Sequence, residues 1–278
     1  MLDAFEVFAF FPEATVAGAL IAAACAALGV FVILKRVVFI GIALSEAAAC
    51  GVAAGLAFGF EPVLGAAALT LGVVGILSYP FEFQRIPRDA ALGGIYVAAG
   101  AGAILLVAHS GFGLHEVQSL LYGDLILASR LDVWILGGTL LPVLGYMIAF
   151  IRPTTYSFLD REAARTLGIR ARVWELLFFF ALGLAVAVSS KVGGAFLVFC
   201  FLVVPPSAAL ILFRGMGKVM AASAAMAVIA VLVGLHVSYA SDLPTNQTIT
   251  AVACGWLALA LLKPAAGAVA TRLRGRRD

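Results

Sequence analysis

Charged residues are scarce in this chain. Only 12% of its 278 residues are Asp, Glu, Lys or Arg, against about 25% in water-soluble domains. Hydrophobic residues make up 64%, which is more apolar surface than a soluble core of this length can hide from water. No sizeable soluble domain is left outside the apolar stretches. The composition therefore excludes a water-soluble globular protein.

The sequence also lacks the motifs of common enzyme sites. It contains no GxxxxGK[ST] loop for binding ATP phosphates, and neither HExxH nor GxSxG. Histidine occurs only three times, and the four cysteines stand singly, without a CxxC pair or zinc-finger spacing. These absences disfavour a membrane-embedded enzyme. Because the ATP-binding loop is absent, any energy-requiring process in this protein would draw on an ion gradient or on an ATPase that is a separate chain.

Long apolar stretches recur along the whole chain. Stretches of about 18 residues or more are long enough to cross a ~30 Å hydrocarbon layer as helices. The start of the first carries Asp3, Glu6 and Glu13 instead of a basic region, which is unlike a cleavable signal. The predicted fold is all-α: one membrane-embedded helical bundle of about eight to nine transmembrane helices over residues 1–278. The candidate spans are 11–34, 37–58, 62–80, 90–109, 132–151, 173–189, 194–213, 219–239 and 247–262.

Basic residues fall on one side of these spans. With the N-terminus outside, every Lys and Arg except Arg130 and Lys191 lies in an inside segment. Because positive residues concentrate in cytoplasmic loops, we expect an outside N-terminus and a cytoplasmic C-terminus. The inside segments are 35–36, 81–89, 152–172, 214–218 and 263–278.

Two connecting segments are longer than minimal turns. Outside, residues 110–131 predict a short helix at the membrane interface. Inside, residues 152–172 predict a two-turn helix that Ser157 or Asp160 caps and Gly168 ends. A charged cytoplasmic helix of this kind is either a docking surface for a soluble partner or a solvated connector held at the lipid headgroups.

A ridge of small residues marks the second predicted span. Gly51, Gly55 and Gly59 form a GxxxGxxxG pattern, which lets another helix approach closely. The partner helix belongs either to the same subunit or to a second copy of the chain.

Five strings of the sequence, in order, resemble one family of membrane transporters. The family is that of the permease subunits of manganese, zinc and iron-chelate ABC importers, and the resemblance spans nearly the whole chain. The strings are LKRVVFIGIALSEAAACG (34–51), YGDLILAS (122–129), SFLDREAARTLGI (157–169), KVGGAFLVFCFLVVPPSAAL (191–210) and SDLPTNQTI (241–249).

The resemblance implies a type II ABC importer-like permease with defined partners. These are a second copy of the chain, a separate ABC ATPase that carries the ATP, an extracytoplasmic substrate-binding protein and membrane lipid, with no nucleic acid. No cofactor is expected on this chain, and a divalent metal is the expected cargo. The segment at about 157–170 is similar to the ATPase-coupling segment of the family. Its matching residues are Asp160, Glu162, Ala163, Leu167 and Gly168.

Glu46 is the most informative single residue. It lies near mid-membrane, about 14 Å into the second predicted span, where a carboxylate costs at least ~2.5 kcal/mol. It should therefore face a partner or a wet cavity, either as a pathway and metal-ligand residue or as a protonated packing residue.

Ile42 and Glu46 stand where the family has an Asp and a His, and Cys50 replaces a Pro on the same helical face. Glu46 and Cys50 would still offer an oxygen and a sulfur to a transition metal.

Two more candidates lie at the outer end of the eighth predicted span. His236 and Asp242 carry groups that bind metals, and both are candidates for the pathway. The alternatives are an interfacial anchor beside Tyr239 for His236, and for Asp242 a cap of the ninth span that turns the chain with Pro244 and Thr245.

Pro205 and Pro206 fall inside the seventh predicted span. They remove backbone donors, so the helix is expected to kink or break there, either lining the pathway or serving packing alone.

Taken together, the sequence predicts a transport subunit and not an enzyme. The leading interpretation is an ABC importer permease that moves zinc, manganese or iron into the cytoplasm by ATP-driven alternating access. One alternative is an ion-coupled secondary transporter or channel that uses Glu46 as a proton or cation site. Another is an ABC permease for a non-metal substrate.

Overall fold

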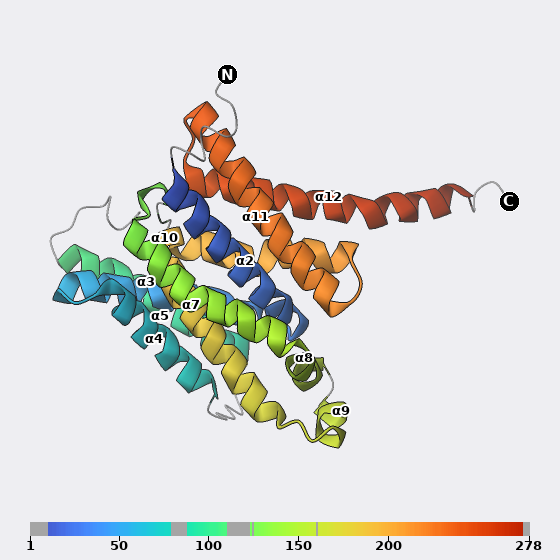
Figure 1. The fold of residues 1–278 in the computed structure, drawn as a ribbon, viewed down its shortest axis with the longest axis horizontal. Coiled ribbons are helices and arrows are strands. Elements are labelled where there is room, and N and C mark those ends of the chain that lie inside the picture. The colour runs from blue at the N-terminus through green and yellow to red at the C-terminus, as the bar shows by residue number, and fades with distance from the viewer. Residues whose placement is uncertain (1–10, 79–87, 110–122, 124, 160, 275–278) are drawn as a thin grey trace.

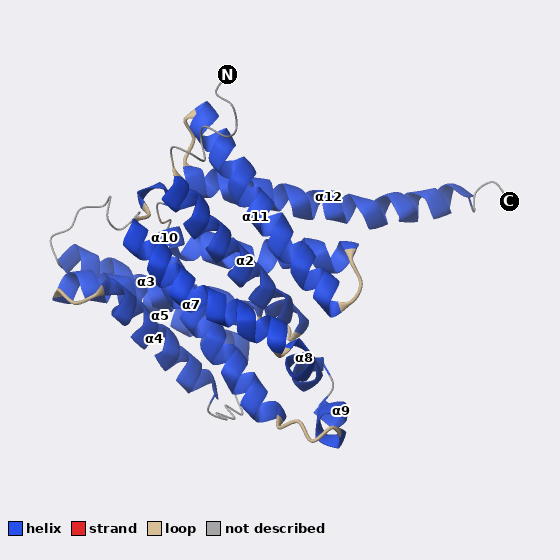
Figure 2. Cartoon of the chain, viewed as in Figure 1, coloured by secondary structure: helices blue, strands red, loops and turns tan. Residues whose placement is uncertain are grey.

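Helices account for all the regular structure in the described part of the chain. The computed structural model describes residues 11–78, 88–109, 123, 125–159 and 161–274 (Figure 2). The elements are α2 (Pro12–Leu34), α3 (Val38–Phe58), α4 (Pro62–Ser78), α5 (Arg88–His109), η1 (Leu125–Leu127), α7 (Arg130–Ala149), α8 (Ile151–Leu159), α9 (Arg161–Thr166), α10 (Ala171–Leu212), α11 (Met216–Ser241) and α12 (Thr245–Arg274).

Every predicted span overlaps one of these helices, but two of them share an element. The predicted spans 173–189 and 194–213 both lie in α10, which has 42 residues. A straight helix of that length would measure about 63 Å, twice the ~30 Å hydrocarbon layer. Instead α10 bends at Gly194, and its two halves diverge from there (Figure 1). In the described residues, six helices including α10 are long and apolar enough to cross a membrane.

The bend in α10 lies before its two prolines. Gly194 has φ 72° and ψ 160°, a conformation open essentially only to glycine, whereas the helix is not broken at Pro205 or Pro206. Pro206 cannot donate a hydrogen bond to the Leu202 carbonyl, and Gly29 of α2 packs directly on that carbonyl. Helices α2 and α10 therefore pack closely at this point. Gly29 has no side chain, so α2 can lie against the Leu202 carbonyl that Pro206 leaves without its helical hydrogen bond.

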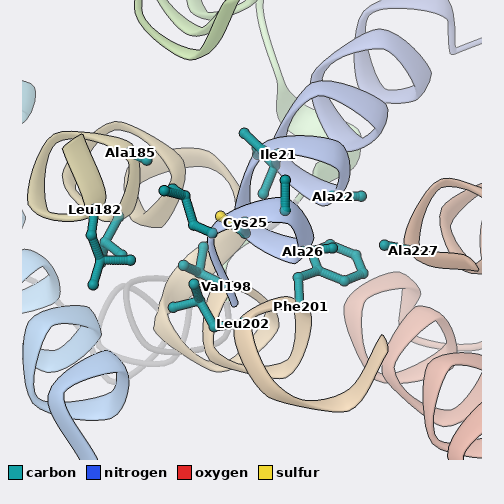
Figure 3. Close-up of a cluster of buried hydrophobic side chains, with 14 of the residues drawn as sticks. Ile21, Ala22, Cys25, Ala26, Leu182, Ala185, Val198, Phe201, Leu202 and Ala227 are labelled. Atoms are coloured by element: carbon teal, nitrogen blue, oxygen red, sulfur yellow. The ribbon is translucent and has the colours of Figure 1, made fainter. Parts of the chain in front are cut away.

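Helix α2 lies at the centre of the core. Figure 3 shows Cys25 and Ala26 of α2 next to Val198 and Phe201 of α10, with Ala227 of α11 beside Phe201. All five are buried, with at most 1% exposure. The buried Ser223 hydroxyl of α11 donates to the Ala26 carbonyl of α2 at 3.0 Å. Such an all-round apolar helix has no polar face to present to water.

The glycine ridge of α3 packs within the chain. A Cβ at Gly51 would overlap the backbone of Gly65 in α4, and one at Gly55 would lie 2.7 Å from the Cα of Pro62. Gly59 ends α3 in the left-handed conformation, with φ 74°. For Gly51 and Gly55 the close partner is thus α4 of the same subunit.

Ion pairs join the elements at the end of the bundle where α10 bends. Lys191 Nζ of α10 lies 2.9 Å from Asp132 Oδ1 of α7 and 3.8 Å from Glu61 Oε1 before α4. Asp132 also closes a capping box with Ser129, so α7 begins at Arg130 rather than at 132 as predicted. Of the predicted interfacial segment 110–131, residues 110–122 and 124 lie outside the described residues, and the rest contains only the single turn η1 before α7.

Candidate functional site

Glu46 lines a cavity between three helices. The cavity has a volume of about 240 Å³, and α3 contributes Glu46 to it, α5 Tyr96, and the second half of α10 Phe196 and Phe199. Glu46 Oε2 is buried and has no hydrogen-bond partner in the described part of the protein. The full lining is Ile42, Ser45, Glu46, Tyr96, Ala195, Phe196 and Phe199. The sequence predicts that Glu46 faces a partner or a wet cavity, and the structure places it in the wall of this cavity.

Small residues of α5 make room for the polar face of α3. A Cβ at Gly100 would lie 3.6 Å from Glu46 Oε2, and one at Gly102 would lie 3.2 Å from Cys50 Sγ. Both side chains therefore point toward α5. Cys50, however, is 9% exposed and packs in an apolar cluster with Ala53, outside the lining of the cavity. Of the predicted face, Ile42 and Glu46 line the cavity and Cys50 does not.

The structure does not bring His236 and Asp242 to this cavity. His236 is half-buried in α11, and its Nδ1 has no hydrogen-bond partner in the described residues. Asp242 is exposed and ends α11 with φ 53° and ψ 44°, where its backbone N–H donates to Ser238. Asp242 thus caps the end of the eighth predicted span, whereas α12 begins at Thr245. Across the described ranges, no group of three or more His, Cys, Asp or Glu residues is placed to hold a metal ion.

The charged helix predicted within residues 152–172 corresponds to α9. Leu167 N–H donates to the Ala163 carbonyl at 3.1 Å, Gly168 N–H to Arg165 at 3.1 Å and Ile169 N–H to Ala164 at 2.8 Å. With Gly168 at φ 71°, the last two bonds form a Schellman motif. The prediction that Gly168 ends the helix is confirmed.

The surface of α9 is exposed at one extremity of the molecule (Figure 1). Leu167 is 60% exposed although it is apolar, Glu162 is exposed, Ala163 is half-buried and Ala164 is fully buried. Asp160 lies outside the described residues. Ser157 is not the cap of α9, because it lies inside α8 and its hydroxyl donates to the Pro153 carbonyl at 2.7 Å. An additional helix, α8, thus precedes α9.

Several groups around these sites were not predicted from the sequence. Tyr96, Phe196 and Phe199 line the cavity, but aromatic residues inside apolar spans have no distinguishing pattern. Asn246 Nδ2 donates to the Gly193 carbonyl at 3.1 Å and so fixes the bend of α10 against the start of α12. The only available signal was a polar amide next to an apolar span.

Known proteins with similar sequences include membrane subunits of manganese transport systems. The manganese transport system membrane protein MntC of Halalkalibacterium halodurans is 28% identical over 97% of this chain and 93% of its own length. The manganese import system permease protein ScaB of Streptococcus pneumoniae is 24% identical over 89% of this chain and 88% of its own.

The fold is also found among solved structures. PsaBC from Streptococcus pneumoniae, in complex with a Fab, superimposes with a TM-score of 0.81 over 90% of both chains, at 20% sequence identity. The family model described as the ABC 3 transport family matches residues 7–263, nearly the whole chain. The chain is therefore a multi-pass membrane protein that belongs to the ABC 3 transport family, whose members are permease subunits of ABC transporters.

Proposed function

We propose that this chain is the membrane permease of an ABC importer that carries a divalent transition metal into the cytoplasm, and that the metal is manganese. The observation that carries the proposal is the similarity to a relative named for manganese transport over 97% of this chain. The cargo would be substrate and not a resident cofactor, and ATP would bind to the partner ATPase.

Glu46 is proposed to contact the metal in transit. Carboxylate and water oxygens suit manganese, and Glu46 has a buried oxygen with no hydrogen-bond partner in the described residues. The cavity volume of about 240 Å³ is large enough to hold several water molecules. A single carboxylate in a cavity of this size fits an ion that keeps much of its hydration shell.

The exposed α9 is proposed to dock the ATPase. An exposed leucine, Leu167, at the end of a charged helix supplies an apolar anchor with a polar rim, which is the usual composition of a docking interface. The proposed assembly comprises two copies of this chain, two ATPase subunits and an extracytoplasmic binding protein that delivers the metal. One permease domain with its coupling segment at about 157–170 would then perform ATP-driven alternating access.

The membrane topology is proposed to have nine crossings. Each half of α10 would cross once, and the shorter apolar stretches Pro62–Ile76 and Ala91–Val107 would each cross once. The N-terminus would be outside and the C-terminus in the cytoplasm. This arrangement puts the α10 bend outside and α9 inside, and Figure 1 draws them at opposite ends of the bundle.

An ion-coupled transporter is the second candidate. The isolated carboxylate of Glu46, with a buried oxygen, favours it because such groups bind protons or cations in gradient-driven carriers.

One experiment separates these functions. Metal uptake is measured in proteoliposomes that contain the permease and its ATPase, supplied with manganese, zinc or iron. In Glu46→Ala, manganese uptake should fall about tenfold or more, because a hydrogen bond or ligand contact to a charged group is worth about 1.5–3 kcal/mol. The matched control Glu61→Ala changes an exposed carboxylate outside the cavity and should retain uptake.

Three results would contradict parts of the proposal. Unchanged uptake in Glu46→Ala would remove Glu46 from the pathway. Uptake without ATP that an ionophore abolishes would establish the ion-coupled transporter. Coupled ATP hydrolysis with no metal uptake would indicate a permease for a non-metal substrate.

A further inference from the structure

A partly buried ion pair joins the ends of two helices on the side of the bundle where α8 lies. Lys35 follows the last residue of α2, and its Nζ lies 2.9 Å from Oε1 of Glu175 in the second turn of α10. Each side chain is only 16% exposed. Since exposed ion pairs contribute little, the burial of this pair is what makes it mechanically relevant.

The same ammonium group also contacts α8. Lys35 Nζ lies 4.3 Å from the ring centroid of Phe158 in α8 and 5.3 Å from that of Phe179 in α10. Both distances lie within the ~6 Å range of a cation–π contact, which is stronger when the cation is partly desolvated. One side chain at the end of α2 thus contacts both α8 and α10.

Aromatic packing reinforces this contact. The Phe158 ring lies 4.9 Å from Phe178 in a T-shaped arrangement, 5.9 Å from Phe31 and 6.4 Å from Phe179, measured between ring centroids. Phe31 and Phe178 are fully buried. Phe158 therefore anchors α8 to α2 and α10 in a close-packed core that resists deformation. We call Lys35, Glu175, Phe158 and the three rings around Phe158 the α8 junction.

The α8 junction connects the exposed end of the molecule to the cavity. Helix α9 contacts α8 and the start of α10, and Phe158 is the penultimate residue of α8. The other half of α10 carries Phe196 and Phe199 of the Glu46 cavity. A displacement of α8 therefore reaches α2 and α10 through packed contacts, without passing through a loop.

We propose that Lys35 and Phe158 are positioning residues that transmit movement of α8 and α9 to α2 and α10, and thereby couple ATP hydrolysis to opening of the cavity. The inference rests on the proposed function, because it presumes a docked ATPase. It adds a transmission route to the docking surface. If the α8 junction is loosened, the ATPase should still dock and hydrolyse ATP. Helices α2 and α10 should then no longer move with α8 and α9.

The test measures ATP hydrolysed per manganese ion taken up, in proteoliposomes that contain the permease and its ATPase. Phe158→Met replaces the ring with an apolar side chain of similar reach, and Lys35→Met combined with Glu175→Gln removes the ion pair without leaving a buried unpaired charge. Both should raise the ratio about fivefold or more, the lower range of typical coupling effects. Phe158→Tyr keeps the ring and should stay coupled.

Matched controls separate a transmission role from a structural one. Phe180→Met changes an adjacent phenylalanine of α10 that is 51% exposed, and Lys191→Met breaks the ion pair beside the bend of α10; neither should change the ratio. If hydrolysis and uptake fall in proportion in the junction variants, or if Phe158→Tyr is as uncoupled as Phe158→Met, the inference is overturned. If the wild-type assembly shows no ATP-dependent uptake, the proposed function itself fails.

Discussion

At the residue scale, glycine sets how closely the helices approach. Gly51 and Gly65 bring the backbones of α3 and α4 into contact, and Gly100 and Gly102 let α5 cover Glu46 and Cys50. Inside a membrane, helix association depends on such close packing, because lipid tails are as apolar as the helices themselves. These glycines thereby allow α4 and α5 to pack closely against α3, the helix that carries Glu46.

Gly51→Ala should lower the free energy of unfolding in detergent by about 1–3 kcal/mol, because the added methyl group meets the backbone of α4 and not a movable side chain. Thermal unfolding of the purified protein measures the effect. Gly72→Ala is the matched control on α4, where a Cβ meets nothing within 4 Å. It should be neutral or stabilising by up to ~1 kcal/mol. Equal behaviour of the two variants would contradict the packing argument.

At the element scale, the bend of α10 is the feature that shapes the molecule. One continuous element supplies Glu175 and Phe178 to the α8 junction before the bend, and Phe196 and Phe199 to the cavity after it. The conformation of Gly194 and the hydrogen bond from Asn246 to Gly193 hold the two halves apart. Because the angle between the two halves of α10 is fixed in this way, a movement of one half should also move the other.

Gly194→Ala should destabilise the protein by about 1–3 kcal/mol, because φ 72° with ψ 160° is strained for any residue with a Cβ. The expected observation is a lower unfolding temperature in detergent. Gly137→Ala in α7, where a Cβ meets nothing within 4 Å, serves as the control and should not lower it. An unfolding temperature for Gly194→Ala equal to that of the control would show that the bend tolerates an ordinary residue.

At the scale of the whole molecule, the two ends of the bundle differ in character. One end carries the α10 bend and the ion pairs of Lys191, and the other carries α8 and the exposed α9 (Figure 1). The proposed cycle requires such a division, because cargo enters at one end while force from the ATPase is applied at the other.

Leu167→Ser should abolish ATP-dependent uptake and co-purification of the ATPase, while the permease remains in the membrane. Burying a leucine side chain at an interface is worth about 1.5–3 kcal/mol, so ATPase binding should weaken about tenfold or more. Leu127→Ser changes a leucine that is 77% exposed in η1, next to α7, and should leave ATPase binding intact. Retention of the ATPase by both variants would show that Leu167 is not part of the docking surface.

Much of the fold was predictable because the membrane imposes simple rules. Each predicted span overlaps a helix, and α9 ends at Gly168 as its glycine indicated. The site was predictable only in part: Glu46 stood out as a carboxylate inside an apolar span, but its aromatic neighbours did not. Pro205 and Pro206 drew attention as helix breakers, yet the break is at Gly194, since a proline within a packed helix is tolerated where a neighbour fits its freed carbonyl.

The sequence by itself determined that the protein is a bundle of apolar helices with one carboxylate at membrane depth and a charged helix between spans, because periodicity, length and charge are local properties. Only the tertiary structure decided that the glycine ridge packs on α4 and that Glu46 lines the cavity whereas Cys50 does not. It also decided that Lys35 contacts Glu175 and Phe158. Those pairings join residues far apart in the chain. Packing of whole helices, and no property of either partner alone, selects them.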